Sequence, residues 1–205
     1  MGFTGLLWSG FVLTHMLGNM LIFLGPEHYN GYSYALIHNP IIIPAEIVLL
    51  LTLVLHAVVG VTLTVKNKMA RDQKYAMPTN GEKAARPNSK WMIYHGTILL
   101  VFIILHLITF KYGTNYTVTT NGVEMRDLYR LVLDVFHQPG YVIWYVIALI
   151  FVGLHLSHGF YSAFASLGFY HPVYSKWLSC FGYVYGVIIA LGFMSQPIYV
   201  YFFAP

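Results

Sequence analysis

Residues 141–164 read YVIWYVIALIFVGLHLSHGFYSAF, an apolar run that contains no Asp, Glu, Lys or Arg. At about 1.5 Å of rise per residue, a helix of this length spans the roughly 30 Å hydrocarbon core of a bilayer. Four more runs are long and predominantly apolar. The sequence therefore predicts an all-α fold in a single domain over 1–205, an integral membrane bundle of five transmembrane helices at about 3–24, 41–65, 91–112, 141–166 and 177–203.

The composition excludes a water-soluble globular domain. Hydrophobic residues make up 58% of the 205 residues, charged residues only 9%, and the mean hydropathy is +0.64, whereas a soluble domain carries about 25% charged residues. The single cysteine, Cys180, excludes a disulfide framework or a thiolate metal site built by this chain alone. The first apolar run has no basic segment before it and no small-residue cleavage pattern after it, so we interpret it as a retained helix.

Lys and Arg are distributed unevenly between the loops. Seven of the eleven basic residues lie between the second and third predicted helices: Lys66, Lys68, Arg71, Lys74, Lys83, Arg86 and Lys90. The loop after the fourth helix adds Lys176, whereas residues 25–40 contain no Lys or Arg and residues 111–140 balance theirs with acids. Because basic loops face the cytoplasm, the sequence predicts a multi-pass protein of the cytoplasmic (inner) membrane with its N-terminus inside and its C-terminus outside. The pI of about 9.1 follows from this topology and gives no reason to infer nucleic-acid binding.

Turn-forming pairs occur in the loops, among them Asn30–Gly31 and Asn121–Gly122. We expect turns at both, with a short hairpin or a surface helix around Asn121–Gly122. The loops are too short for a catalytic domain, so any chemistry lies within the bundle.

Four of the ten histidines lie deep in a predicted helix, one in each of the first four: His15, His56, His106 and His155. A histidine that hydrogen-bonds to a neighbouring helix would explain any one of them, but four placements on four successive helices form a pattern. Neutral imidazole is a common metal ligand, and two opposed imidazoles are what a six-coordinate haem iron needs. The pattern predicts two haem sites, each held by a pair of histidines.

Depth sorts these histidines into pairs. His106 lies near the outer end of a helix that runs outward, and His155 lies toward the cytoplasmic end of a helix that runs inward. His56 is also on the inner half, while His15 is near the middle of its span. Elimination predicts an inner pair, His56 with His155, and an outer pair, His15 with His106.

Three of these histidines have a glycine about one turn further on, on the same helix face: Gly18, Gly60 and Gly159. Such glycines would leave room for a flat haem, or they would let helices pack closely. In the fifth helix, which has no deep histidine, the spacing of Gly182, Gly186 and Ala190 predicts close packing alone.

Two segments carry a family resemblance: SGFVLTHMLGN at 9–19 and LHLSHGF at 154–160. Together with one deep histidine per helix, they resemble the dihaem cytochrome b subunit of succinate:quinone and fumarate:quinone oxidoreductases, in the type with a single five-helix anchor. In that family the first and third helices supply the ligands of the outer haem, and the second and fourth supply those of the inner haem. The resemblance thus implies the same pairs as the depth count.

The resemblance also implies partners. A flavoprotein with covalently bound FAD would interconvert succinate and fumarate, and an iron–sulfur protein would dock on the cytoplasmic face, where the basic loop 66–90 would contact it or anionic lipid. This chain would carry electrons to or from menaquinone or another quinone without holding the dicarboxylate site itself. A dimer of the whole complex is left open.

Further residues are candidates for the surroundings of these sites. Lys90, Trp91 and His95 near the cytoplasmic start of the third helix could hold haem propionates, although Lys and Trp there also suit an interfacial belt; His158 lies one turn after His155. Glu46, near the outer start of the second helix, is the best carboxylate for a quinone site that handles protons. It could equally be a helix N-terminal charge favoured by the dipole.

Two rival functions use the same residues. A cytochrome b anchor of another membrane oxidoreductase, such as a nitrate reductase or a hydrogenase, also pairs histidines across helices. A histidine-lined metal permease is the rival from a different class, but the internal repeats and broken helices of many transporters are not evident in this sequence.

Overall fold

The computed structural model describes residues 1–70, 87–169, 171 and 173–204, and it is an all-α bundle. Within these ranges, five helical segments are long and apolar enough to cross a membrane, so the chain is a multi-pass membrane protein: Gly2–Leu24, Ile42–Met69, Trp91–Lys111, Pro139–Ser166 and Tyr174–Phe203. The predicted fold class is confirmed. The second segment runs four residues beyond its predicted end at 65, and the fifth begins three residues before its predicted start at 177.

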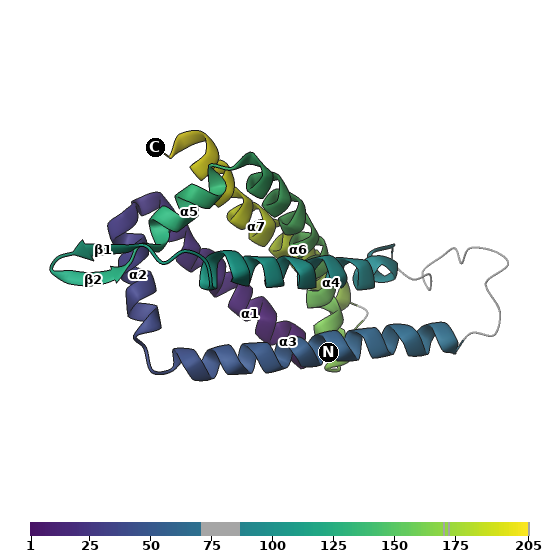
Figure 1. Ribbon diagram of the computed structural model, residues 1–205. Coiled ribbons are helices and arrows are strands. Elements are labelled where there is room, and N and C mark those ends of the chain that lie inside the picture. Colours follow the sequence, from purple (N-terminus) through teal and green to yellow (C-terminus); the bar gives the residue numbers. More distant parts are fainter. Residues whose placement is uncertain (71–86, 170, 172, 205) are drawn as a thin grey trace.

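The elements follow one another along the chain as labelled in Figure 1. They are α1 (Gly2–Asn19), η1 (Met20–Leu24), α2 (Pro26–Ile37), α3 (Ile42–Met69), α4 (Pro87–His106), η2 (Leu107–Lys111), β1 (Thr117–Thr120), β2 (Val123–Arg126), α5 (Leu128–Phe136), α6 (Pro139–Ser166) and α7 (Tyr174–Phe203).

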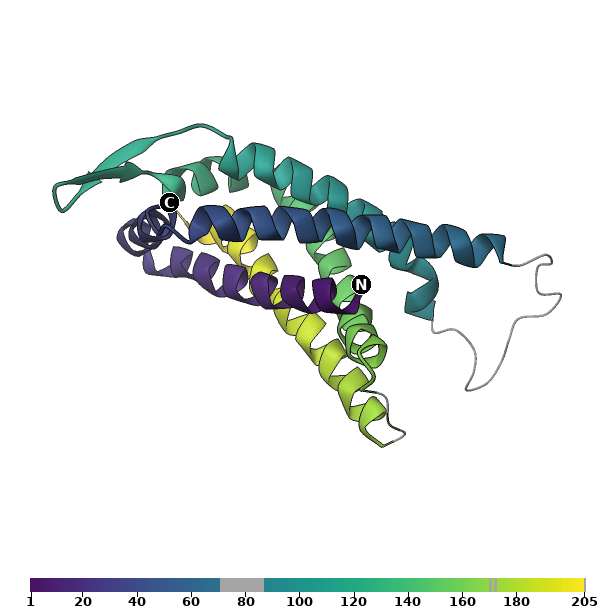
Figure 2. The same ribbon diagram turned by 90° about the horizontal axis from the view of Figure 1, so that it is seen from below.

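The helices α6 and α7 pack side by side and slant across the direction of α3 and α4 (Figures 1 and 2). Small residues make their close approach possible: a Cβ on Gly186 would lie 2.5 Å from the carbonyl oxygen of Gly153, and a Cβ on Gly153 would lie 2.9 Å from the Cβ of Ala190. A Cβ on Gly182 would lie 3.1 Å from the Ser157 oxygen. The stripe predicted in the fifth helix therefore acts in packing, as expected.

The helix α3 lies at the edge of the bundle. None of its residues, all of which are described, is buried, although its mean hydropathy of 2.5 is the highest of the five segments. An apolar helix that the protein does not cover needs an apolar solvent, which the lipid supplies. Its main contacts are with α1 and α4, and Thr4 of α1 lies beside its histidine, His56.

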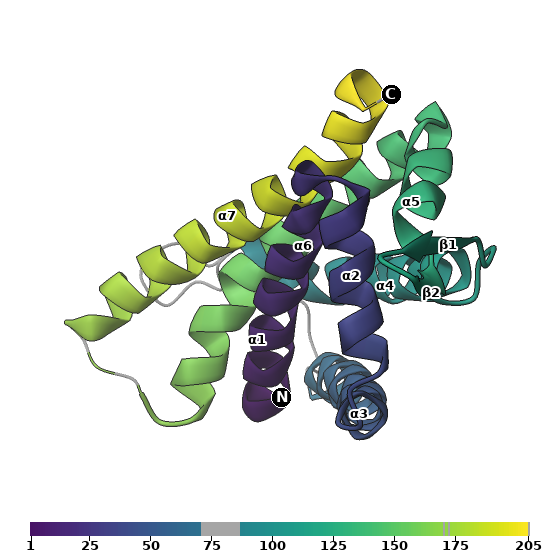
Figure 3. The ribbon, with the colours of Figure 1, turned by 90° about the vertical axis from the view of Figure 1, so that its left-hand side faces the viewer.

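One end of the bundle carries α2, the β1–β2 hairpin and α5, and Figure 3 views the molecule from this hairpin end. The hairpin expected at Asn121–Gly122 is present: both residues have positive φ, 53° and 78°, as a two-residue turn between twisted strands requires. A surface helix, α5, is present as well. Its buried face, which includes Leu131, Val135 and Phe136, packs down onto the bundle.

The turn predicted at Asn30–Gly31 is wrong, because both residues lie inside α2. Pro26 occupies the first position of this helix, where it favours a helix start. The Asn30 side chain is 2% exposed; its Nδ2 donates to Asp127 Oδ1 at 2.8 Å and its Oδ1 accepts from the Tyr129 backbone N–H at 2.9 Å. These tertiary hydrogen bonds outweigh the local preference of Asn–Gly for a turn.

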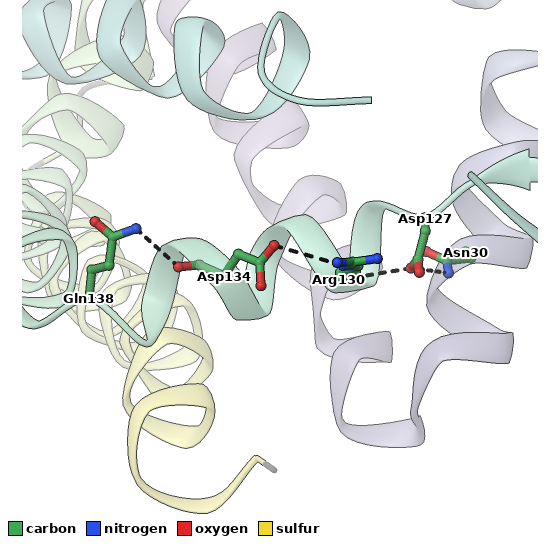
Figure 4. Close-up of polar contacts among 5 residues, drawn as sticks. All are labelled: Asn30, Asp127, Arg130, Asp134 and Gln138. Carbon is green, nitrogen blue, oxygen red and sulfur yellow. Dashed lines mark hydrogen bonds and ion pairs between the residues drawn. The ribbon is translucent and has the colours of Figure 1, made fainter. Parts of the chain in front are cut away.

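Figure 4 shows how polar contacts continue along α5. Asp127 caps the helix by accepting from the Arg130 backbone N–H at 3.1 Å, and the Arg130 side chain reaches Asp134 Oδ2 at 4.0 Å. Gln138 Nε2 then donates to the Asp134 carbonyl at 3.2 Å. The Asn30–Asp127 bond thus joins α2 to α5 within the hairpin end, and the buried face of α5 packs this end against α6 and α7.

Candidate functional site

His15 of α1 and His106 of α4 face each other near the hairpin end. Their ring centres lie 5.9 Å apart and their planes are inclined at 89°. This is one of the two pairs expected from depth.

Aromatic side chains from three helices surround this pair. The His106 ring lies 5.8 Å from Phe102 and 5.4 Å from Phe110, while the His15 ring stacks on Phe11 at 5.3 Å and approaches Phe193 of α7 at 5.8 Å. A site lined in this way excludes water and favours a flat aromatic ligand over a hydrated ion.

Each histidine of the pair also has a polar neighbour. The Nδ1 atom of His106 lies 3.1 Å from the Tyr145 hydroxyl of α6. Asn19 Nδ2 donates to the His15 carbonyl at 2.8 Å, and Asn19 Oδ1 accepts from the buried Tyr29 hydroxyl of α2 at 2.8 Å. Burial raises the pKa of Tyr29, which keeps the phenol protonated and able to donate. The hairpin end is therefore connected to the site by hydrogen bonds.

The helix that carries His106 changes its winding directly after it. Residues Leu107–Lys111 form a π-helical turn, a feature that often occurs at functional sites because it re-aims side chains. Arg126 of β2 donates to the Phe110 carbonyl at 2.9 Å near the end of this turn. The amino-acid sequence has no recognised signal for such a turn.

The second pair consists of His56 of α3 and His155 of α6, with ring centres 6.3 Å apart and planes at 62°. Thr4 Oγ1 of α1 lies 3.0 Å from His56 Nδ1. Two glycines on neighbouring helices lie beside the rings: a Cβ on Gly5 would lie 3.6 Å from His56 Cε1, and a Cβ on Gly96 would lie 3.8 Å from His155 Cε1, both ordinary contact distances.

These are not the glycines that the sequence singled out. A Cβ on Gly18 would lie 2.7 Å from the Tyr32 hydroxyl, so Gly18 serves the packing of α1 against α2. A Cβ on Gly60 would lie 3.2 Å from the Met1 side chain. Of the three glycines predicted from the sequence, only Gly159 faces open space. Sequence reasoning missed Gly5 and Gly96, because nothing in the sequence says which glycine faces a histidine on another helix.

His95 belongs near the second pair. It is 6% exposed, and its ring lies 5.5 Å from Phe151, one turn before His155 on α6. Among the described residues, the Nδ1 atoms of His95 and His155 are buried without a hydrogen-bond partner. Buried polar atoms of this kind are costly, so these two atoms fit a site that takes a further group.

The two pairs lie about one half of a membrane apart. Thr4, which contacts His56, and His15 are 11 positions apart on α1 (15 minus 4), which is about 16 Å at 1.5 Å per residue. On α6, Tyr145 and His155 are 10 positions apart, or about 15 Å. Two helices thus give the same separation between the sites.

The ring separations suit a shared metal ion. A first-row metal lies about 2.0–2.1 Å from an imidazole nitrogen, which lies about 1.2 Å from the ring centre, so two imidazoles opposite each other on one metal have centres about 6.4 Å apart. The observed separations are 5.9 and 6.3 Å. Both pairs therefore have about the separation that two histidines holding one iron would need.

No protein-family model, curated protein or solved structure matches the chain. In the described part of the chain, no group of three or more His, Cys, Asp or Glu side chains converges, so each pair offers two protein ligands. Two are enough for a haem iron, because the porphyrin supplies four more, whereas a structural zinc ion takes four ligands of its own.

The remaining candidate residues have varied surroundings. Glu46 lies beyond the first turn of α3 and forms an ion pair with Lys111 at the end of η2, where both side chains are partly exposed at 48% and 40%. A charge favoured by the helix dipole is expected within the first turn, and Glu46 lies just beyond it. Trp91 is 58% exposed, as in an interfacial belt, and His158 has an interaction partner of its own. The Lys90 side chain, like Arg71, Lys74, Lys83 and Arg86, lies outside the described residues.

Proposed function

We propose that this chain is the membrane-anchor cytochrome b subunit of a succinate:quinone or fumarate:quinone oxidoreductase and that it holds two b haems. The observation that carries the proposal is the set of two facing imidazole pairs, drawn from four different membrane-crossing helices. The resemblance of segments 9–19 and 154–160 to the dihaem family supports the same conclusion.

The four histidines would hold the two haems in this proposal. His15 and His106 would hold the haem nearer the hairpin end, and His56 and His155 would hold the haem nearer the opposite end. When bound, the two haems supply a one-electron relay between the iron–sulfur subunit and a membrane quinone. The surrounding aromatic side chains exclude water from the pair at the hairpin end.

The partners bind at the end opposite the hairpin. The iron–sulfur subunit docks there, on the cytoplasmic side, and the flavoprotein with its FAD holds the dicarboxylate site. Lys66 and Lys68 are exposed at the last turn of α3 and can pair with acidic groups of a docked protein. A lipid-only role for this basic stretch remains the competing explanation, since basic cytoplasmic loops are general.

The quinone, menaquinone or another, exchanges protons near the hairpin end. Glu46 is the carboxylate that supports this placement. It is paired with Lys111, five residues after His106, and is open to the surroundings. A partly exposed carboxylate beside a haem ligand can accept a proton from a quinol and release it to water.

The test is an optical spectrum of the purified membrane protein, followed by pyridine haemochrome analysis and identification of the co-purifying subunits. Two b haems per chain and a flavoprotein with an iron–sulfur protein are expected. One haem or none would refute the dihaem proposal. Two haems with molybdenum- or nickel-containing subunits would instead indicate an anchor of the nitrate reductase or hydrogenase type, and bound metal without haem would indicate a permease.

A further inference from the structure

Thr4 makes two hydrogen bonds with one hydroxyl group. Its Oγ1 lies 3.0 Å from the Met1 carbonyl oxygen and 3.0 Å from His56 Nδ1, and the residue is 6% exposed. A threonine hydroxyl has one proton to donate and two lone pairs that accept. We assign the hydroxyl proton to the Met1 carbonyl, which can only accept and which also accepts from the Gly5 backbone N–H at 2.9 Å. The contact with His56 is then satisfied only when His56 Nδ1–H donates to Oγ1.

This assignment determines which nitrogen of His56 is free. A neutral imidazole carries one proton, so a protonated Nδ1 leaves Nε2 with its lone pair. The Cε1 atom between the two nitrogens lies against the backbone of α1 at Gly5, where a side-chain carbon would be 3.6 Å away. Contact with α1 at both Nδ1 and Cε1 limits rotation of the ring, whose centre lies 6.3 Å from that of His155.

We propose that Thr4 is a positioning residue for His56: it selects the tautomer that binds iron through Nε2 and makes that imidazole a stronger electron donor. The proposal rests on the proposed haem function. A ligating histidine commonly donates its other N–H to an acceptor, which raises the basicity of the ligand. A more basic ligand favours ferric over ferrous iron, so the Thr4 bond lowers the potential of the haem held by His56 and His155.

The experiment is a redox titration of the intact complex with Thr4→Val, a substitution that keeps the shape of the side chain and removes the hydroxyl. We expect Thr4→Val to bind as much haem as the parent. The haem component that is lost in His155→Ala should show about a tenfold higher ferrous-to-ferric ratio at a given potential, which is a shift of about 59 mV for one electron. The other component should not move. Thr4→Ser, which keeps the hydroxyl, should restore the parental titration.

Thr62→Val is the matched control. Thr62 lies on the same helix as His56 and is exposed. Among the described residues, its hydroxyl donates to the Val58 carbonyl at 2.8 Å and has no hydrogen bond to a histidine. It should leave both components unshifted. If Thr4→Val does not accumulate, Thr4→Ala removes the same hydrogen bond, and the same shift in potential is expected for it.

The outcomes separate the two proposals. Two haems in the parent with an unshifted component in Thr4→Val would overturn the role of Thr4 alone, as would an equal shift in Thr62→Val or a shift that Thr4→Ser does not reverse. A parent that binds no haem would overturn the proposed function, and the role of Thr4 with it.

Discussion

If the two histidine pairs hold haems as proposed, replacement of His106 by alanine should remove the haem nearer the hairpin end and leave the other in place. His106 contributes one of the two facing rings of its pair, and the second pair shares neither of its histidines. Replacement of His155 should have the converse effect. In His106→Ala the remaining haem should still be reduced from the succinate side, while quinone-linked turnover stops.

The size of the effect follows from what else could reach the iron. The polar neighbour of the His106 ring is the Tyr145 hydroxyl, 3.1 Å from His106 Nδ1. Nε2 lies roughly 2.2 Å further across the ring, so that hydroxyl is about 5 Å from the ligand position, more than twice a metal–ligand bond of about 2 Å. Changes to groups that only orient a ligand cost about 10–100-fold in metal affinity, and loss of the ligand itself should cost more. The haem content should fall from about two to about one per chain.

The assay is pyridine haemochrome analysis with redox titration of parent, His106→Ala and His155→Ala. His38→Ala is the matched control, because His38 is exposed and its ring nitrogen lies 2.8 Å from the Tyr34 carbonyl one turn away; it should keep both haems. Loss of the same spectral component from both test variants would mean that His106 and His155 share one haem. Retention of two haems in either variant would refute its assigned role as a ligand.

Three further changes test other parts of the structure. Gly186→Leu places a new Cβ 2.5 Å from the Gly153 carbonyl oxygen, so it should destabilise the bundle by about 1–3 kcal/mol in a detergent unfolding titration. A variant as stable as the parent would contradict the packing of α6 against α7. Asp127→Ala removes the cap of α5 and should cost about 1–2 kcal/mol locally, measured as faster amide exchange in α5, and unchanged exchange would argue against it. Glu46→Gln should keep both haems, and it should keep full stability because the exposed ion pair with Lys111 contributes little. It should slow quinone turnover, and turnover equal to that of the parent would exclude Glu46 from the proposed quinone site.

The membrane-crossing helices could be predicted because hydropathy alone determines them. The histidine pairs could be predicted because depth is a one-dimensional quantity: counting residues from the ends of a helix places His106 and His155 at different levels, and only partners at the same level can meet. The loops were harder. Asn30 looks like a turn residue in isolation, and only its bonds to Asp127 and Tyr129, about 100 residues away, explain why it lies in a helix.

Contacts between helices were beyond sequence reasoning for a related reason. Periodicity shows which residues share a face of one helix, but not which face of which neighbour they meet. Gly5 and Gly96 were therefore missed as the glycines beside the rings. For Gly18 the sequence allowed either room for a haem or close helix packing, and the contact with Tyr32 favours packing. The ion pair of Glu46 with Lys111 was missed in the same way.

The two sites are built reciprocally on α1 and α6. The first helix carries His15 and contacts His56 through Thr4, while α6 carries His155 and contacts His106 through Tyr145. Each of these helices therefore takes part in both pairs, and α3 and α4 each supply one ring.

The helix α7, which has no deep histidine, packs against both α6 and α1. On one side, α7 packs against α6 at Gly186. On the other, its Tyr185 hydroxyl donates to the Ser9 carbonyl of α1 at 2.6 Å, and a Cβ on Gly192 would lie 2.3 Å from Met16. A change in α7 that shifts α6 relative to α1 alters both ring separations together, whereas a change in α3 or α4 alters one. Of the five helices, α7 is thus the one whose packing, without any ligand of its own, bears on both sites.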